Sequence, residues 1–334
     1  MAYSGKALKG AKIIITVGEF DVPYNEVPEN VKYEKFVQQA LSEKGISSET
    51  VFLEHKDFDN KENLRNRILN VAPDIVFNLF EGFYDDSSKE PVFAEVLEEL
   101  KIPYTGNSAH ALRTCLNKQR TKDILKENGL PVPQGFVIYS VDDLKKQSPI
   151  FPVFMKPVAE DASLGIDKES LAMDMNALIS AAGKKLKAFP AGILAEEFLY
   201  GQEFNVGVVG NGEYEVFGVS VIDYSGHEDM PFLTYSSKWD EQSEEYRKTM
   251  PVFEKGIDQN IRKNLLEMAA EAGRALKCKG YFRVDFRAKG EKIYIIDVNP
   301  NPDISPDAGF AKQAAGRGYS YPDVIKKILD LAWN

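Results

Sequence analysis

Strand-like and helix-like segments alternate through the first third of this 334-residue chain. Three short apolar runs predict buried strands, at residues 13–17, 50–53 and 74–80. Helix-period patterns separate or follow them, at about residues 28–43, 60–71 and 91–100. Strands that are joined through helices pair in parallel, and the helices cover the faces of the sheet. We therefore expect an α/β domain with a parallel sheet over residues 1–107.

The chain changes character beyond this domain. A capped helix is expected over about residues 117–128, followed by Gly129 as a C-terminal stop. Mixed strands and helices then predict an α+β organisation for the rest of the chain. Residues 225–255 are polar, acidic and aromatic without clear periodicity, and a loop of that length inside a compact protein is usually functional or disordered.

Composition narrows the class of protein. The net charge of −10 argues against a nucleic-acid binder, which would show a basic face. Cys115 and Cys278 are too few for a disulfide framework and lack metal-ligand spacing, so buried free thiols are expected. The first residues contain no apolar signal core, and no apolar stretch approaches the roughly 20 residues that span a bilayer. We expect a cytoplasmic protein with neither nucleic acid nor membrane as a partner.

A hairpin near the C-terminus carries charged side chains among apolar ones. Residues 282–300 read as two strands joined by a turn. Alternate side chains of a strand share a face, so Ile295, Asp297 and Asn299 are expected to face the same way. If the strands pair in register, Asp285 meets Asp297 and Asn299 across the ladder.

Two interpretations of the hairpin stay open. Two carboxylates this close repel unless a cation lies between them, and oxygen ligands beside a phosphate are how proteins hold Mg²⁺. The hairpin would then be the floor of a Mg-nucleotide site. Alternatively, Arg283–Asp285 and Arg287–Asp297 are surface ion pairs worth under about 1 kcal/mol each.

Two upstream segments contain residues that could bind the nucleotide itself. Lys156 ends an apolar strand, and the small-residue loop 159–165 follows, whose backbone N–H groups can close over a phosphate. Further on, Glu196 and Glu203 bracket a strand and a turn, and carboxylates there can contact an adenine edge and ribose hydroxyls. The plainer alternatives are a solvated strand-end lysine and solvated acids beside a buried strand.

These segments follow the order of the ATP-grasp superfamily, and from about residue 73 the chain resembles its D-alanine–D-alanine ligases. Three further matches are Ile-Pro-Tyr-Thr-Gly-Asn-Ser at 102–108, Leu-Asn-Lys-Gln-Arg-Thr-Lys at 116–122 and Tyr-Ser-Ser-Lys-Trp at 235–239. The resemblance implies an ATP-grasp fold behind an N-terminal substrate domain. Its expected parts are residues 1–107, a central ATP-grasp subdomain over 108–198, and a C-terminal subdomain with the Mg site over 199–334.

The resemblance also implies a role for each matching residue. The residues implied for ATP are Lys118, Lys156 and Ser163 at the phosphates, and Glu196, Glu197, Leu199 and Glu203 at the adenosine. Those implied for two Mg²⁺ ions, with Mn²⁺ as a substitute, are Asp285, Asp297 and Asn299. Those implied in stabilising the transferring phosphoryl group are Arg283, Lys238 and Tyr235. The last two belong to the loop 225–255, which is expected to close over the site.

The substrate half departs from the family pattern. Residues 17–23 replace an N-terminal Gly-Gly-x-Ser-x-Glu segment, and residues 77–82 replace a His-Gly segment. Asp303 stands where the family has a glycine whose amide meets the acceptor carboxylate, and an anionic side chain there should repel a carboxylate. The candidate substrate contacts are therefore Glu81, Asp303 and Ser305.

The expected activity is an ADP-forming, ATP-dependent ligation of a carboxylate to an amine through an acyl phosphate. The amino acid or amine pair is expected to differ from that of D-alanine–D-alanine ligases. The alternatives are a D-alanine–D-alanine ligase proper, a non-catalytic nucleotide-binding protein, and ATP-grasp kinase or carboxylase chemistry. Because relatives of this kind are commonly dimers, a homodimer is a further expectation.

Overall fold

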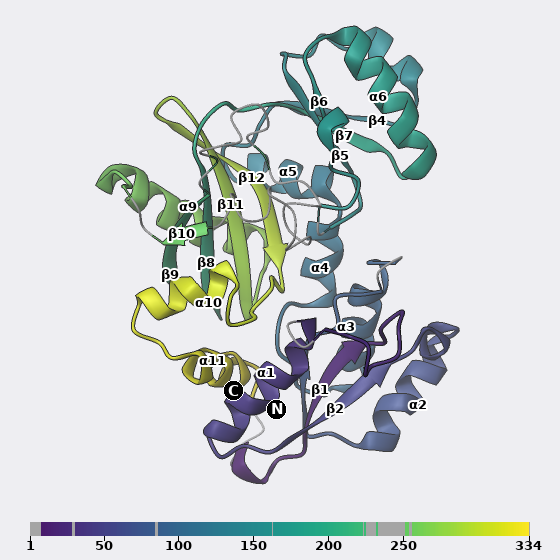
Figure 1. The fold of residues 1–334 in the computed structure, drawn as a ribbon, viewed down its shortest axis with the longest axis vertical. Helices are drawn as coiled ribbons and strands as arrows, with labels where there is room; N and C mark the ends of the chain where they lie inside the picture. Colours follow the sequence, from purple (N-terminus) through teal and green to yellow (C-terminus); the bar gives the residue numbers. More distant parts are fainter. Residues whose placement is uncertain are drawn as a thin grey trace.

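The computed structural model describes residues 8–28, 31–83, 86–161, 163–222, 224, 232, 251–253 and 256–333. The strands in this part of the chain form three separate sheets of three, four and five strands (Figure 1). No helix within these described residues is long and apolar enough to cross a membrane.

The N-terminal sheet is parallel, as the sequence predicts. Its strands are β1 (Ile13–Gly18), β2 (Ser48–Leu53) and β3 (Ile75–Asn78), in the order β2-β1-β3. Residues 13–17 of β1 are all buried, because helices cover both faces of the sheet. This burial explains why β1 lacks the alternation of apolar and polar residues that a half-exposed strand would show.

The helices around this sheet are α1 (Tyr33–Glu43), α2 (Lys61–Val71), α3 (Lys89–Leu100) and α11 (Tyr321–Trp333). Ile13 and Ile15 pack with α1 and α11, whereas Ile14 packs with α2 and α3. The last helix of the chain therefore completes the core of the first domain (Figure 1). Helix α1 begins later than the predicted residue 28, because a turn precedes it in which Val31 N–H donates to Pro28 O.

The central sheet is antiparallel and small. Its strands are β4 (Gly135–Ile138), β5 (Val153–Pro157), β6 (Leu171–Ala172) and β7 (Ile193–Glu197), in the order β4-β7-β5-β6. Helix α6 (Met175–Ala188) buries Leu178 and Ala182 in the core of this sheet, beside Met155. This core is separate from that of the neighbouring sheets.

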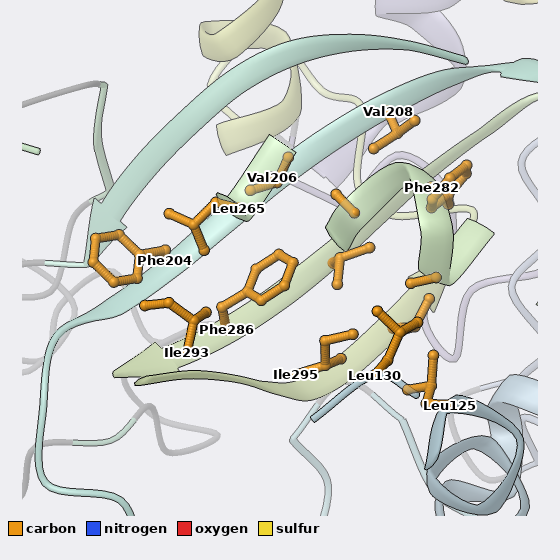
Figure 2. Packing of buried hydrophobic residues seen from close by; sticks show 14 of the residues in the cluster. Leu125, Leu130, Phe204, Val206, Val208, Leu265, Phe282, Phe286, Ile293 and Ile295 are labelled. Carbon is orange, nitrogen blue, oxygen red and sulfur yellow. The ribbon is translucent and has the colours of Figure 1, made fainter. Parts of the chain in front are cut away.

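The C-terminal sheet is antiparallel and carries the hairpin. Its strands are β8 (Glu203–Asn211), β9 (Glu213–Ile222), β10 (Pro251–Phe253), β11 (Tyr281–Lys289) and β12 (Lys292–Pro300), in the order β10-β9-β8-β11-β12. Helix α9 (Gln259–Leu276) inserts Leu265 against Phe204 and Phe286 on one face of the sheet (Figure 2). Helix α10 (Gly309–Gly316) contacts β8 and β9 and places Gln313 against the backbone of Gly207.

Two consecutive helices, α4 (Ala109–Leu116) and α5 (Lys118–Glu127), connect the first sheet to the others. Asn117 ends the first and caps the second, because its Oδ1 accepts from the N–H of Arg120 at 3.0 Å. The predicted helix over residues 117–128 is thus α5. The sequence analysis did not predict α4 and α10. The remaining elements are short 3₁₀ turns at Leu8–Gly10, His55–Phe58, Val141–Lys146 and Lys168–Ser170.

Candidate active site

The two carboxylates of the hairpin lie directly opposite each other. Asp285 pairs with Asp297, and Arg283 pairs with Asn299, in the antiparallel ladder. One residue further, the register shifts by one, so that Phe286 lies opposite Ile295. This β-bulge overturns one prediction. Ile295 does not share a face with Asp297, because the extra residue turns it into the apolar core.

Asp285 is held by three neighbours. Arg283 donates to both of its oxygens, from Nε at 2.7 Å and from an Nη at 3.0 Å. Asn299 donates to Oδ2 at 2.8 Å and Asn205 to Oδ1 at 2.7 Å. Asn205 was not predicted from the sequence. Its position opposite Asp285 could have identified it only if the pairing of β8 with β11 had been known.

Asp297 faces cations instead. Lys118 Nζ lies 3.2 Å from its Oδ2. Burial by itself would raise the pKa of Asp297, but the positive charges of Lys118, Lys156 and Lys122 outweigh burial and hold the pKa well below its ordinary value. Asp297 is therefore ionised across the physiological range.

The two interpretations of the hairpin can now be compared. The Arg283–Asp285 pair exists, but both side chains are largely buried, so it is no solvated surface pair. The Arg287–Asp297 pair was a wrong alternative, because the bulge places Arg287 opposite Tyr294. Arg287 instead has an Nη 3.5 Å from Glu203.

Two buried lysines share the carboxylate of Glu196. Lys122 Nζ lies 2.9 Å from one oxygen and Lys156 Nζ 3.1 Å from the other. Burial and the nearby Lys156 lower the pKa of Lys122 to about 8, although Glu196 opposes the shift. Burial would raise the pKa of Glu196, yet the two lysines lower it on balance. The sequence analysis gave no role to Lys122, although it closes the 116–122 motif.

The remaining residues expected near adenosine lie around the junction of β7 and β8. Glu203 is buried and accepts from the hydroxyl of Tyr224 at 2.8 Å. Leu199 is also buried, and Glu197 pairs with Lys289 of β11. Ser163, in the loop expected over the phosphates, adopts a left-handed backbone with φ 63°.

The residues expected near the substrates differ in exposure, since Ser305 is buried, Asp303 half-buried and Glu81 exposed. Asp303 accepts from the N–H of Ser305 at 2.8 Å, and its carboxylate adds to the field at Glu81. Desolvation by neighbouring residues, assisted by the charges of Asp303 and Asp161 and opposed by Arg283, raises the pKa of Glu81 to about 8, although the residue is exposed. Glu90, missed by the sequence analysis, accepts from Asn301 Nδ2 at 2.8 Å. Burial, together with Glu81 and Asp161, holds the pKa of Glu90 well above its ordinary value.

Two expected catalytic residues, Tyr235 and Lys238, lie outside the described residues. The same holds for most of the loop 225–255 in which they occur.

Comparison with known proteins decides the family. Residues 124–330 match the family described as the D-ala D-ala ligase C-terminus. The chain belongs to this family. A D-alanine–D-alanine ligase of Gluconobacter oxydans is 30% identical over 76% of this chain and 79% of its own length. D-alanine–D-alanine ligase B of Chromobacterium violaceum is 27% identical over 88% of this chain and 89% of its own length.

Solved structures support the ATP-grasp fold. The D-alanine–D-alanine ligase of Bacillus anthracis in complex with ATP superposes with a TM-score of 0.70, at 18% identity, over 96% of this chain and 97% of its own. The VanG D-Ala:D-Ser ligase of Enterococcus faecalis gives the same TM-score at 20% identity, over 96% of this chain and 99% of its own.

The hairpin fits the divalent metal that this family implies. Asp285, Asp297 and Asn299 supply oxygen donors, the ligand type that Mg²⁺ prefers. Within the described part of the chain, no group of three or more His, Cys, Asp or Glu side chains could hold a metal alone. Mg²⁺ usually binds to one or two carboxylates and takes its other ligands from phosphates and water. Two carboxylates and an amide are a set of ligands of this kind.

Proposed function

We propose that this protein is an ATP-dependent ligase that joins a carboxylate to an amine through an acyl phosphate. One observation carries the proposal. Lys118, whose chain position resembles that of a phosphate-binding lysine, lies against Asp297 of the acidic hairpin, and Lys156 lies close enough to lower the pKa of the same carboxylate. Cations for phosphate and oxygens for metal therefore converge, which is the arrangement that phosphoryl transfer requires.

The chain's own residues suggest how the transfer proceeds. Lys118 and Lys156 bind the phosphates of ATP, with Ser163 above them. Glu196, Glu197, Leu199 and Glu203 contact the adenosine. Asp285, Asp297 and Asn299 would hold Mg²⁺, which supplies charge neutralisation at the phosphates when bound.

Arg283 has the geometry to stabilise the phosphoryl group as it moves to the substrate carboxylate. Its guanidinium is oriented by Asp285. It stays positively charged, because Asp285 raises its pKa despite the opposing effect of burial. The amine of the second substrate then attacks the acyl phosphate, an amide bond forms, and phosphate leaves. Tyr235 and Lys238 complete this proposal from the loop 225–255.

The three parts of the chain that we propose correspond to the three sheets. We propose residues 1–107 as the substrate domain, 108–198 as the central ATP-grasp subdomain and 199–334 as the C-terminal subdomain with the Mg site. The participation of α11 in the first domain's core supports a fixed placement of the substrate domain against the C-terminal subdomain.

We also propose a substrate pair other than two D-alanines. Asp161 and Asp303 raise the pKa of Glu81, and Glu81 and Asp161 raise that of Glu90, while Arg283 opposes the shift at Glu81. This group of carboxyl side chains favours a substrate with an additional amine, and Ser305 donates its backbone N–H to Asp303 within the group. A D-alanine–D-alanine ligase proper is the second candidate, favoured by the names of the relatives.

The test is phosphate release from ATP with a panel of D- and L-amino acids and diamines, with mass spectrometry of the products. Ligation that requires a diamino acid or amine would support the altered pair. Ligation of D-alanine to itself at the highest rate in the panel would support the second candidate. ATP binding without phosphate release for any pair would overturn the ligase proposal in favour of a non-catalytic nucleotide-binding protein.

A further inference from the structure

The β-bulge beside Asp297 is bound by two lysines. Lys122 Nζ donates to the carbonyl oxygens of Ile295 at 3.2 Å and Ile296 at 2.8 Å, and Lys156 Nζ donates to Ile296 O at 2.9 Å. Ile296 is the residue that the shift of register leaves without a partner on β11. Lysine ammonium groups therefore satisfy the carbonyl at the bulge.

The same two lysines hold Glu196, as described above. Lys122, Lys156, Glu196 and Ile296 thus form a closed ring of four hydrogen bonds, which we call the lysine clamp. Its acceptors come from different sheets, because Glu196 lies in β7 of the central sheet and Ile296 lies in β12 of the C-terminal sheet. Helix α5, which carries Lys122, lies between these sheets (Figure 1).

The two lysines differ in whether they can leave the lysine clamp. Lys122 has three N–H donors and three acceptors at bonding distance, and its side chain is buried. Lys156 is also buried, but in the proposed function it must turn to a phosphate of ATP. When it does so, Glu196 loses one of its two cations. A buried carboxylate without a cation is strongly unfavourable, so Lys156 can leave only if Lys122 remains.

We propose that Lys122 is a positioning residue that holds Glu196 and the bulge in place while Lys156 exchanges from the clamp to the nucleotide. This inference rests on the proposed function and adds a residue to it. Through Ile296, the same bonds fix the bulge, which determines that Asp297 faces Lys118 and not the apolar core. Lys122 acts on ATP through Lys156 and Asp297 and does not touch it.

The experiment is a double-mutant cycle on the affinity for Mg-ATP, measured by calorimetry, with thermal unfolding of every variant. Lys122→Met leaves Lys156 as the only cation of Glu196, so the dissociation constant of Mg-ATP should rise at least about tenfold. Lys122→Met combined with Glu196→Gln removes the charge that detains Lys156, while the glutamine keeps the length of the side chain and an oxygen for the contact with adenosine proposed for Glu196. The double variant should therefore bind ATP more tightly than Lys122→Met alone, by about fivefold or more.

Lys126→Met is the matched control, since it removes an exposed lysine one turn later on the same helix. It should leave both the ATP affinity and the melting temperature at the wild-type values. A purely structural role of Lys122 predicts an additive cycle, in which Glu196→Gln changes the ATP affinity by the same factor in the wild type and in the Lys122→Met background, whereas exchange of Lys156 predicts a larger gain in the Lys122→Met background.

The outcomes separate the two proposals. An additive cycle in a chain whose wild type binds Mg-ATP would overturn the role of Lys122 and leave the proposed function standing. A wild-type chain that binds no Mg-ATP would overturn both. Recovery of affinity in the double variant, without recovery of its melting temperature, would support exchange of Lys156 over a general stabilising effect.

Discussion

Lys118 Nζ lies 3.2 Å from Asp297 Oδ2, so a lysine expected to bind phosphate is paired with a carboxylate expected to bind metal. The same theme recurs across the site, since Lys156 is paired with Glu196 and Arg283 with Asp285. Lys118, Lys156 and Arg283 therefore each have a carboxylate partner whose charge resembles that of a phosphate. The charges are held in position by their mutual attraction, and in the proposed function binding of Mg-ATP would exchange one set of ion pairs for another.

Asp297→Ala tests the metal assignment. The variant should lose at least about a hundredfold in the rate of ATP-dependent phosphate release, because a carboxylate beside the transferring phosphoryl group is removed. It should still fold, since the side chain lies outside the apolar cores and its loss leaves them intact. The measurement is phosphate release, accompanied by far-ultraviolet circular dichroism. Wild-type turnover in a folded variant would refute the assignment.

Arg283→Lys tests the bidentate contact. A lysine keeps the charge but cannot donate to both oxygens of Asp285 in the planar arrangement of a guanidinium. We expect kcat to fall by about a hundredfold with a smaller change in the KM for ATP. Arg274→Lys, on the exposed side of α9, is the control and should change neither constant. An equal effect of both substitutions would argue against a catalytic role for Arg283.

A pair of glycine substitutions tests the core. A Cβ on Gly273 of α9 would lie 2.3 Å from the ring of Phe282, so Gly273→Ala should destabilise the fold by about 1–3 kcal/mol. Gly183, inside α6, has only Val141 near its Cβ position, at 3.6 Å. Gly183→Ala should therefore stabilise the fold by about 0.5–1 kcal/mol, because alanine favours helix. Denaturant unfolding measures the change in the free energy of unfolding for each variant. A change of the same sign in both variants would contradict this packing.

The raised pKa of Glu81 predicts that the stability of the fold depends on pH. Its value of about 8 in the folded chain lies above the ordinary value of 4.5, so between these pH values the folded state binds a proton that the unfolded state has released. The contribution of Glu81 to the free energy of unfolding is thus fully present below about pH 4.5 and is lost as pH rises through about 8. Because the side chain is open to solvent, the effect should be modest.

Glu81→Gln provides the comparison for this pH dependence. The melting temperature of the wild type should fall relative to that of the variant as pH rises from 5 to 8.5. Parallel curves for the two proteins would show that Glu81 titrates with its ordinary pKa.

Much of the site was predictable because strand periodicity acts locally. Strand alternation predicted that Asp285 meets Asp297 and Asn299 if the two strands pair in register. The structure confirms the pairing of Asp285 with Asp297, whereas Asn299 lies opposite Arg283 and reaches Asp285 with its side chain. The bulge at Ile296 was not predictable, because its carbonyl is bound by Lys122 and Lys156, which lie far away in the sequence. Asn205 was missed for the same reason, since its contact with Asp285 depends on the pairing of β8 with β11.

The sequence alone determined the parallel arrangement of the first sheet, the hairpin and the residue types that a nucleotide site requires. These follow from short-range periodicity and from the fixed chemistry of each side chain. Only the tertiary structure decided which charges meet. Lys122, Glu196 and Ile296 come from three separate elements, and nothing in their local sequence specifies that they share a buried ring of hydrogen bonds. Burial selects such partners, because a charge removed from water is tolerated only where the fold supplies its counter-charge.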